Sequence, residues 1–260
     1  MSLLRIFVSS AVFSFRAQFS WLNLPMWLAM KFTMPLSAMA FFVFVGQFAG
    51  ADVAYIAIGN AMTVLSWNTV FSVINITSHD KWDGTLPLLL ATPAHRLPLF
   101  VGRAMIHVFD GMLSVAISFA YAVFFFGVNF GSADVQALIL VVFLTAFTMA
   151  GFGLLIGGLS FYVRSPLVFA NIFTFILMVF CGVNFPIQKL PQPLQIISYI
   201  FPLTYGLDAG RRTIAGATLT DVAPLLGQML IVGIVSIILG YFFFISFEHM
   251  ARKTGRIEAV

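Results

Sequence analysis

The sequence carries very little charge. Aspartate, glutamate, lysine and arginine make up 8% of it, whereas soluble globular proteins carry about a quarter. Hydrophobic residues make up 61%, and the mean hydropathy is +1.03. This composition places the chain far outside the soluble class, and no nucleic-acid partner is expected.

Cysteine is almost absent too. The single residue, Cys181, excludes a disulfide framework and a cysteine metal site, and its apolar surroundings indicate a buried small side chain. The sequence contains no GxxxxGK[ST] phosphate loop, no HExxH, no CxxC and no GxSxG. We therefore predict no catalytic or metal-ligating residue and no cofactor on this chain, which has no visible means of using an energy source itself.

Long apolar runs are what the sequence has in abundance. Runs of about 20 apolar residues are typical of membrane-spanning helices, and β-barrel strands would alternate with period two. We predict an all-α membrane protein with six spans, at residues 25–48, 53–77, 104–126, 136–163, 167–185 and 222–247.

The basic residues predict the orientation of these spans. An even number of spans puts both termini on one side, and that side receives Arg5, Arg16, Lys81, Arg96, Arg103, Arg164, Arg252, Lys253 and Arg256, against Lys189, Arg211 and Arg212 opposite. The positive-inside rule then places both termini in the cytoplasm of a bacterial-type plasma membrane, with a multi-pass chain. Lys31, just inside the first span, is expected to snorkel toward the cytoplasmic face.

Residues 1–23 resemble a signal peptide at first sight, with an early arginine and an apolar middle. Their polar residues instead fall on one side of a helix, and apolar residues fill much of the remainder. We favour a cytoplasmic interfacial amphipathic helix over a cleaved signal. Trp21 and Trp27 lie where the chain would enter the bilayer. Residues 24–260 form the transmembrane domain.

The third span carries a polar stripe that must face protein or a water-filled path, because polar groups facing lipid are costly. Its members are Arg103, His107, Asp110, Ser114, Ser118 and Tyr121. Two interpretations stay open. The stripe holds helices together, with Asp110 paired to His107 or Arg103, or it lines a transport path through His107, Asp110 and Ser114. We favour the first interpretation.

Three other spans have a distinctive face. The fourth presents small residues that allow close helix packing, within the chain rather than between subunits: Ala146, Ala150, Gly153, Gly157 and Ser160. The fifth presents Asn171, Thr174, Met178, Cys181 and Phe185, and the second presents Asn68, Ser72 and Asn75. Mild polarity mixed with apolar residues suits the release of an amphipathic cargo, and it equally suits ordinary packing.

The segment 186–215 is too polar and too rich in proline for a full span. We predict two short re-entrant or interfacial half-helices on the outer side. Tyr199, Phe201 and Tyr205 would form an aromatic lining of the outer path, and Arg211 and Arg212 would lie at headgroup level. The alternative is a cap that only seals the resting assembly.

A charged, turn-flanked segment, "HDKWDGTLPLLLATP", interrupts the apolar runs between the second and third spans. Asp83 is a suitable N-cap for a helix over residues 83–92, and Pro93 ends it. Leucines give this helix an apolar surface. A short cytoplasmic amphipathic helix of this kind is suited to docking onto a soluble motor.

This segment resembles the coupling helix of ABC-2 type transporter permeases, in which an acidic-basic pair precedes Gly-Thr-Leu and a Leu-rich turn ends in Thr-Pro. Gly102-Arg103 and "GVNFPIQKLPQPLQIISYIFPLTYGLDAGR" also resemble that family, and the likeness covers nearly the whole chain. Here Asp80 and Asp83 flank Lys81-Trp82, where many relatives have a glutamate, so either acid is a candidate for the ATPase contact.

The resemblance implies a type V exporter-like fold and a permease that exports by alternating access. It implies two copies of a cytoplasmic ABC ATPase that bind ATP and magnesium, and a second permease copy or a paralogue, all among membrane lipids. The coupling residues it implies are Asp80, Asp83, Gly84, Thr85, Leu86 and Leu89.

The abundance of phenylalanine and methionine favours a hydrophobic or amphipathic cargo, such as a drug, lipid or glycolipid. A permease for polysaccharide or glycolipid is the nearest alternative. A proton-coupled secondary transporter using Asp110 and His107 is a more distant one, because no clear inverted repeat supports it. A membrane enzyme or assembly factor would need a catalytic constellation, and none is evident.

Overall fold

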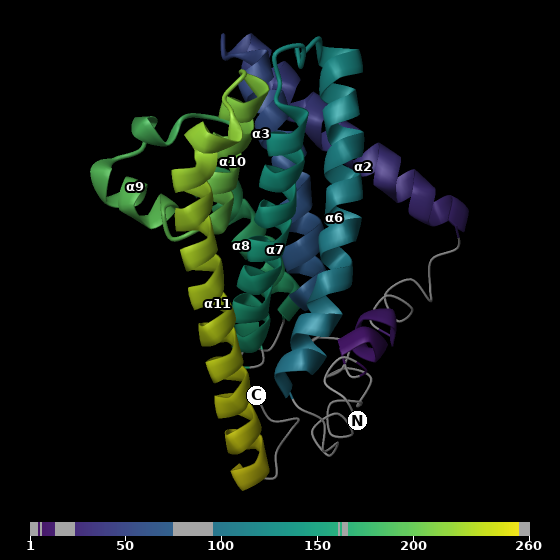
Figure 1. Ribbon diagram of the computed structural model, residues 1–260, viewed down its shortest axis with the longest axis vertical. Coiled ribbons are helices and arrows are strands. Elements are labelled where there is room, and N and C mark those ends of the chain that lie inside the picture. Colours follow the sequence, from purple (N-terminus) through teal and green to yellow (C-terminus); the bar gives the residue numbers. More distant parts are fainter. Residues whose placement is uncertain are drawn as a thin grey trace.

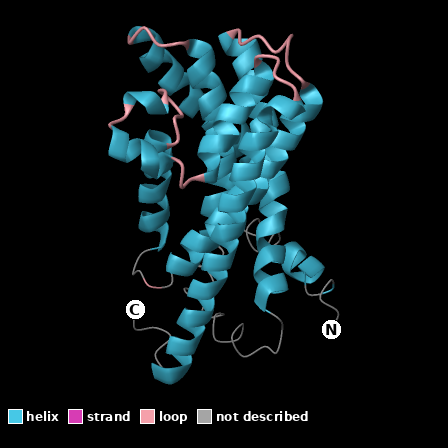
Figure 2. Cartoon of the chain, turned by 60° about the vertical axis from the view of Figure 1, so that its left-hand side comes forward, coloured by secondary structure: helices cyan, strands magenta, loops and turns pink. Residues whose placement is uncertain are grey.

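The computed structural model describes residues 5, 7–13, 24–74, 96–160, 162 and 166–254 (Figure 1). Within these residues every regular element is helical, and Figure 2 shows the helices joined by short loops. The elements are α2 (Leu24–Phe48), α3 (Val53–Ser66), the π-helix η1 (Trp67–Phe71), α6 (Arg96–Phe126), α7 (Val135–Ser160), α8 (Pro166–Phe180), the 3-10 helix η2 (Ile187–Lys189), α9 (Gln192–Ser198), α10 (Pro202–Ile214) and α11 (Leu219–Thr254).

Among the described residues, five helical stretches are long and apolar enough to cross a membrane. They are Pro25–Phe48, Val53–Ile74, Ala104–Phe126, Val135–Leu159 and Leu219–Met250. The run predicted as the fifth span, residues 167–185, instead forms the 15-residue helix α8. At 1.5 Å per residue, α8 rises only about 22 Å, short of a hydrocarbon core of about 30 Å.

Local signals explain where these helices begin and end. Asp52 caps α3, because its carboxylate accepts a hydrogen bond from the backbone N–H of Ala54 at 2.9 Å. Asp221 caps α11 by accepting from the N–H of Thr218 at 2.9 Å. The predicted fifth span ends early because Gly182 adopts a φ of +74°, which favours glycine and breaks the helix after Phe180.

Helix α7 runs through the middle of the bundle (Figure 1). It packs most extensively against α11, and it also contacts α6, α10 and η1. Helices α9 and α10 lie within the proline-rich segment 186–215, and α9 projects to the side of the bundle in Figure 1. The start of α3, the end of α8, the end of α10 and the α6–α7 connection meet at one end of the molecule.

Glycines allow α7 and α11 to approach each other at backbone distance. A methyl group added to Gly158 of α7 would lie 3.0 Å from the carbonyl oxygen of Gly240 on α11. One added to Gly240 would lie 2.7 Å from the backbone nitrogen of Leu155. On another side of α7, Gly153 faces the backbone of Val70 in η1. Of the predicted small-residue face, Ala146, Ala150, Gly153 and Gly157 are buried within the chain, whereas the close approach to α11 is made by Gly158, which was not part of that face.

Helix α2 touches the bundle along a single line. Its buried residues are Lys31, Pro35, Met39, Val43 and Gly46, and the intervening positions are exposed or half-buried. Figure 1 shows α2 running obliquely, with its first turns apart from the other helices.

The predicted interfacial helix is described only in part. Residues 7–13 are helical and pack against the start of α6, where a methyl group on Gly102 would lie 2.5 Å from the carbonyl oxygen of Phe7. Ser10 is buried, whereas Phe13 is 70% exposed. The coupling segment 83–92 lies outside the described residues.

The glycine contact yields a first prediction. Replacing Gly240 with alanine should force α11 away from α7, because the backbone of Leu154 and Leu155 has no freedom to yield, and should cost about 1–3 kcal/mol of stability. Thermal unfolding of the purified protein in lipid nanodiscs measures the loss. Gly227→Ala, on the same helix, is the matched control, because no atom lies within 4 Å of the added methyl. Equal stability of the two variants would contradict the packing described here.

Candidate functional site

The polar stripe of α6 faces the interior of the bundle. His107, Ser114 and Ser118 are fully buried, and the side chain of Asp110 is 8% exposed. The hydroxyl of Ser118 donates to the carbonyl oxygen of Ser114, one turn earlier. The expectation that this stripe faces protein or a water-filled path, and not lipid, agrees with the burial of these four side chains.

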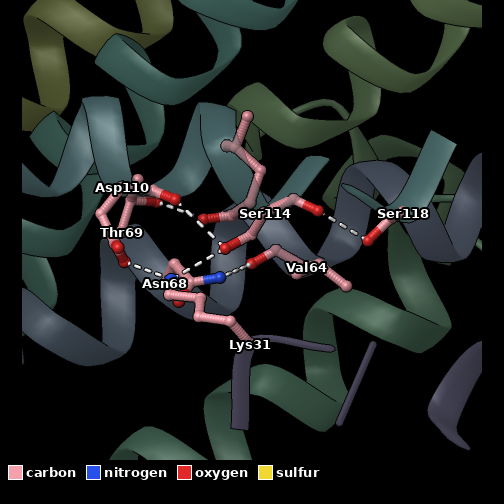
Figure 3. A network of polar contacts seen from close by, with 8 residues as sticks. Lys31, Val64, Asn68, Thr69, Asp110, Ser114 and Ser118 are labelled. Atoms are coloured by element: carbon pink, nitrogen blue, oxygen red, sulfur yellow. Dashed lines mark hydrogen bonds and ion pairs between the residues drawn. The ribbon is translucent and has the colours of Figure 1, made fainter. Parts of the chain in front are cut away.

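The centre of this stripe binds the ammonium group of Lys31 from α2 (Figure 3). Its Nζ lies 2.6 Å from Oδ2 of Asp110, 2.8 Å from Oγ of Ser114 and 3.1 Å from Oδ1 of Asn68. An ammonium group has three donors, and here each has an oxygen acceptor. We call these four residues the Lys31 clasp. It joins α2 to α6 and to η1.

The Lys31 clasp corrects one expectation. Lys31 does not snorkel toward the membrane surface, because its side chain is 9% exposed and points into the bundle. Asp110 pairs with Lys31, a partner that the sequence did not suggest; the suggested pair with His107 or Arg103 stays a prediction, since the side chain of Arg103 lies outside the described residues. Removing one partner of a buried pair leaves an uncompensated charge and typically costs about 3–5 kcal/mol. The clasp therefore fixes the position of α2.

Asn68 contributes to the clasp from a π-helical segment. Its amide nitrogen donates to the carbonyl oxygen of Val64 at 2.9 Å while its amide oxygen accepts from Lys31. Single π-helical turns inside α-helices occur frequently at functional sites. Next to Asn68, the hydroxyl of Thr69 donates to the carbonyl oxygen of Leu65 (Figure 3). The amide of Asn68 is thus fixed from both ends.

A second polar cluster lies at the end of the bundle where α3 begins. Arg211 of α10 donates from Nη2 to the carbonyl oxygens of Tyr55 and Val183, at 3.1 and 2.9 Å. Its guanidinium carbon also lies 3.5 Å from the centre of the Tyr55 ring, a cation–π contact. We call this the Arg211 clasp. It ties α10 to α3 and to the turn after α8.

The guanidinium of Arg211 is therefore turned into the protein, whereas the sequence suggested that it faces lipid headgroups or cargo. Burial lowers the pKa of Arg211 to about 10, against the raising effects of Tyr55, Asp208 and Asp52, so the guanidinium stays positive at neutral pH. Arg212 does face outward, where it pairs with Asp208 at 2.8 Å, and both side chains are about half exposed. An exposed pair of this kind contributes little to stability.

Sequence reasoning missed several members of the Arg211 clasp and its surroundings. The hydroxyl of Tyr55 donates to the carbonyl oxygen of Gly182, and the amide of Asn60 donates to Asn184 at 2.8 Å. Gly59 lies between Tyr55 and Asn60 on α3, and only the absence of a side chain at Gly59 lets Val183 and Arg211 approach this helix. The signal available in the sequence was Gly59 next to Asn60, a glycine beside a polar residue within an apolar run.

The three predicted aromatic residues do not form one lining. Tyr199 and Tyr205 are paired, with ring centres 6.0 Å apart and the Tyr205 hydroxyl donating to the Tyr199 carbonyl. Tyr199 is 48% exposed, whereas Phe201 is 6% exposed and packs against Phe152 and Phe173. Phe201 therefore belongs to the core of the bundle.

The predicted polar face of α8 is divided as well. Asn171 is exposed, Met178 is half-buried, and Thr174 is buried with its hydroxyl donating to the carbonyl oxygen of Ala170. The coupling residues Asp80, Asp83, Gly84, Thr85, Leu86 and Leu89 lie outside the described residues. Within the described ranges, no group of three or more histidine, cysteine or acidic side chains is placed to hold a metal ion.

Five apolar helices of membrane length, packed around buried polar contacts, define a multi-pass helical membrane protein. The model of the ABC-2 type transporter family matches residues 12–215, so the chain belongs to that family. Its members are transmembrane subunits that normally work with an ABC ATPase.

The chain is also similar to the linearmycin resistance permease protein LnrN of Bacillus subtilis (strain 168). The two are 28% identical over 152 residues, which cover 57% of this chain and 38% of that permease. The matched region thus spans well under half of the relative's length.

The Arg211 clasp yields a second prediction. A methyl group on Gly59 would collide with the carbonyl oxygen of Val183 and lie 2.6 Å from the guanidinium of Arg211. Gly59→Ala should therefore open the clasp and lower stability by about 1–3 kcal/mol, measured by thermal unfolding in nanodiscs. Gly210→Ala is the control at the same interface, because its methyl would meet only the Met62 side chain, at 3.6 Å. If the control were the less stable variant, this account of the clasp would be wrong.

Proposed function

We propose that this protein is the permease subunit of an ATP-driven exporter that moves a hydrophobic or amphipathic molecule, such as a drug, lipid or glycolipid, out of the cytoplasm or the inner leaflet. The observation that carries the proposal is the match to the ABC-2 transporter family over residues 12–215. The likeness to a resistance permease supports export of a drug-like molecule.

The proposed topology has six crossings, with α8 and the turn after it as the fifth, and both termini in the cytoplasm. The distribution of basic residues supports it, because Lys189, Arg211 and Arg212 lie beyond the end of α8, whereas α6 begins at Arg96. In this topology α9 and α10 lie on the outer side.

The proposed partners are two copies of a cytoplasmic ABC ATPase, which bind ATP and magnesium, and a second permease that is either an identical copy or a paralogue. We propose that residues 83–92 dock onto the ATPase through Leu86 and Leu89, with Asp80 or Asp83 as the polar contact. Residues 7–13 pack against Gly102, near the start of α6, the helix that follows this segment in the sequence.

The described contacts refine the proposed transport path. His107, Asp110 and Ser114 are buried inside one protomer, and the ammonium of Lys31 binds both Asp110 and Ser114, which favours a structural role in the resting state. Asn171, Met178, Tyr199 and Tyr205 reach the surface of α8, α9 and α10. We therefore assign the outer part of the path to the accessible face of these three helices. The ion pair also makes Asp110 a poor proton carrier.

The docking proposal yields a third prediction. Charge reversal at Asp83 combined with Gly84→Pro should uncouple ATP hydrolysis from transport, because both changes disrupt the start of the docking helix. The measurement compares ATP hydrolysis with the export of a lipophilic dye by inverted vesicles that contain the chain and its co-purifying ABC ATPase. Lys189→Glu is the control, since it also reverses a charge and Lys189 is an exposed side chain of η2, outside the three helices assigned to the path.

Two results would reject the proposal. If no ABC ATPase co-purifies with the chain, the proposed function fails as a whole. If the double variant transports as well as the control, residues 83–92 are not the docking segment.

The topology yields a fourth prediction. In a Cys181→Ala background, Lys189→Cys should react with a membrane-impermeant maleimide added to intact cells, because Lys189 is exposed on the proposed outer side. Arg96→Cys should react only after the cells are opened. Labelling of position 96 from outside would show that the chain has the opposite orientation, and it would contradict docking of the ATPase from the cytoplasm.

A further inference from the structure

Helix α2 contacts the bundle along a single line of buried residues, and the contact nearest its N-terminal end is polar. Of the five buried positions along its contact line, Lys31 is the first, and the residues preceding it are exposed or half-buried. The first turns of α2 therefore depend on the Lys31 clasp for their position. Most of the outward surface of α2 is apolar, and Phe32 and Met34 beside the clasp are 47% and 58% exposed.

The helical hydrogen bonding of α2 is interrupted just after the clasp. Pro35 lies inside α2, and because proline has no N–H, the carbonyl oxygen of Lys31 lacks its usual helical donor. Proline is one of the few causes of sharp kinks in helices, so a hinge is favoured here. The hydroxyl of Tyr121 on α6 donates to the next carbonyl oxygen, that of Phe32, at 3.1 Å. Side-chain contacts of Lys31 and Tyr121 thus hold the part of α2 that precedes Pro35 against α6.

The surface around the clasp suits a molecule from the lipid phase. On α6, Phe109 and Leu113 are 58% and 46% exposed and flank Asp110, while the polar stripe lies directly behind them. Displacement of the first turns of α2 would join this apolar surface to the oxygens of Asp110, Ser114 and Asn68. An amphipathic molecule matches both parts.

We propose that the first turns of α2 form a lateral gate. Release of Lys31 from the clasp lets the segment before Pro35 swing away from α6, and this opens an entry from the bilayer to the polar stripe. The gate rests on the proposed export function, and it supplies the route by which an amphipathic cargo leaves the membrane leaflet and enters the protein.

Ser118 reports on the gate. It is fully buried on α6, between Ser114, which binds Lys31, and Tyr121, which binds the backbone of α2. The test introduces Ser118→Cys into a Cys181→Ala background. The complete complex in nanodiscs is then treated with dodecylmaleimide, a thiol reagent that partitions into the bilayer. Labelling should be slow at rest and several-fold faster during ATP turnover.

Lys31→Met in the same background tests the clasp without nucleotide. It should accelerate the labelling of Ser118→Cys about tenfold or more, because a buried carboxylate without its partner favours the open state. Thr145→Cys is the control reporter. Thr145 is fully buried, and its hydroxyl bonds within α7 and contacts Met229 of α11, far from α2 in sequence and in contacts. Its labelling should not change.

The experiment has two arms, labelling during ATP turnover and labelling of Lys31→Met without nucleotide, and together they distinguish failure of the gate from failure of the proposed function. Export without any acceleration of labelling, in turnover or in Lys31→Met, rejects the gate and leaves the exporter intact. If labelling accelerates in Lys31→Met while the unaltered complex shows no ATP-dependent export, the opening at α2 is supported, but the exporter is rejected and with it the role of the gate in cargo entry. If Lys31→Met does not assemble, the turnover arm decides alone, since it uses the intact clasp. Equal acceleration at Ser118→Cys and Thr145→Cys indicates general loosening and also overturns the gate.

Discussion

A positive charge inside an apolar bundle is stable only where its donors meet acceptors, and Lys31 satisfies this condition with oxygens from two other elements. The position of its Nζ is therefore a constraint on three chain segments at once. Asn68 can meet Lys31 only if η1 keeps its register, and Asp110 and Ser114 can do so only if α6 keeps its rotation. The burial of His107, Ser114 and Ser118 on α6 follows from that rotation.

The Arg211 clasp imposes a comparable constraint at the other end of α3. There the acceptors are backbone carbonyl oxygens and an aromatic ring, and no carboxylate binds the guanidinium within ion-pair distance among the described residues. Carbonyl oxygens from a turn are fixed in place by the turn itself. The sharp break after α8, made by Gly182, thereby becomes part of the attachment of α10. Helices α7 and α11 are instead held by close van der Waals packing, because glycines let their backbones approach each other.

The sequence predicted the features that depend on one helix at a time. Apolar length located five spans, and the prolines between 186 and 202 indicated short helices in that region. The features that depend on several helices were not predictable. Snorkelling is the ordinary behaviour of a lysine near a span end, and only the packing of α2 on α6 and η1 makes the inward rotamer favourable. Phe201 and Tyr199 are two residues apart, and which of them is buried depends on Phe152 and Phe173 of distant helices. The residues proposed for docking gave a sequence signal, but their geometry lies outside the described part of the chain.

The length of α11 has a mechanical consequence. Its 36 residues rise about 54 Å, and even at a tilt of 40° the helix would rise about 41 Å, more than a hydrocarbon core of about 30 Å. At least one end of α11 must therefore stand in water or among headgroups. The final turns carry Glu248, His249, Arg252 and Lys253, which suit that environment. Gly240 of α11 lies at backbone distance from Leu154 and Leu155 of α7. A sideways force on the charged final turns of α11 would therefore be transmitted to α7, at the centre of the bundle.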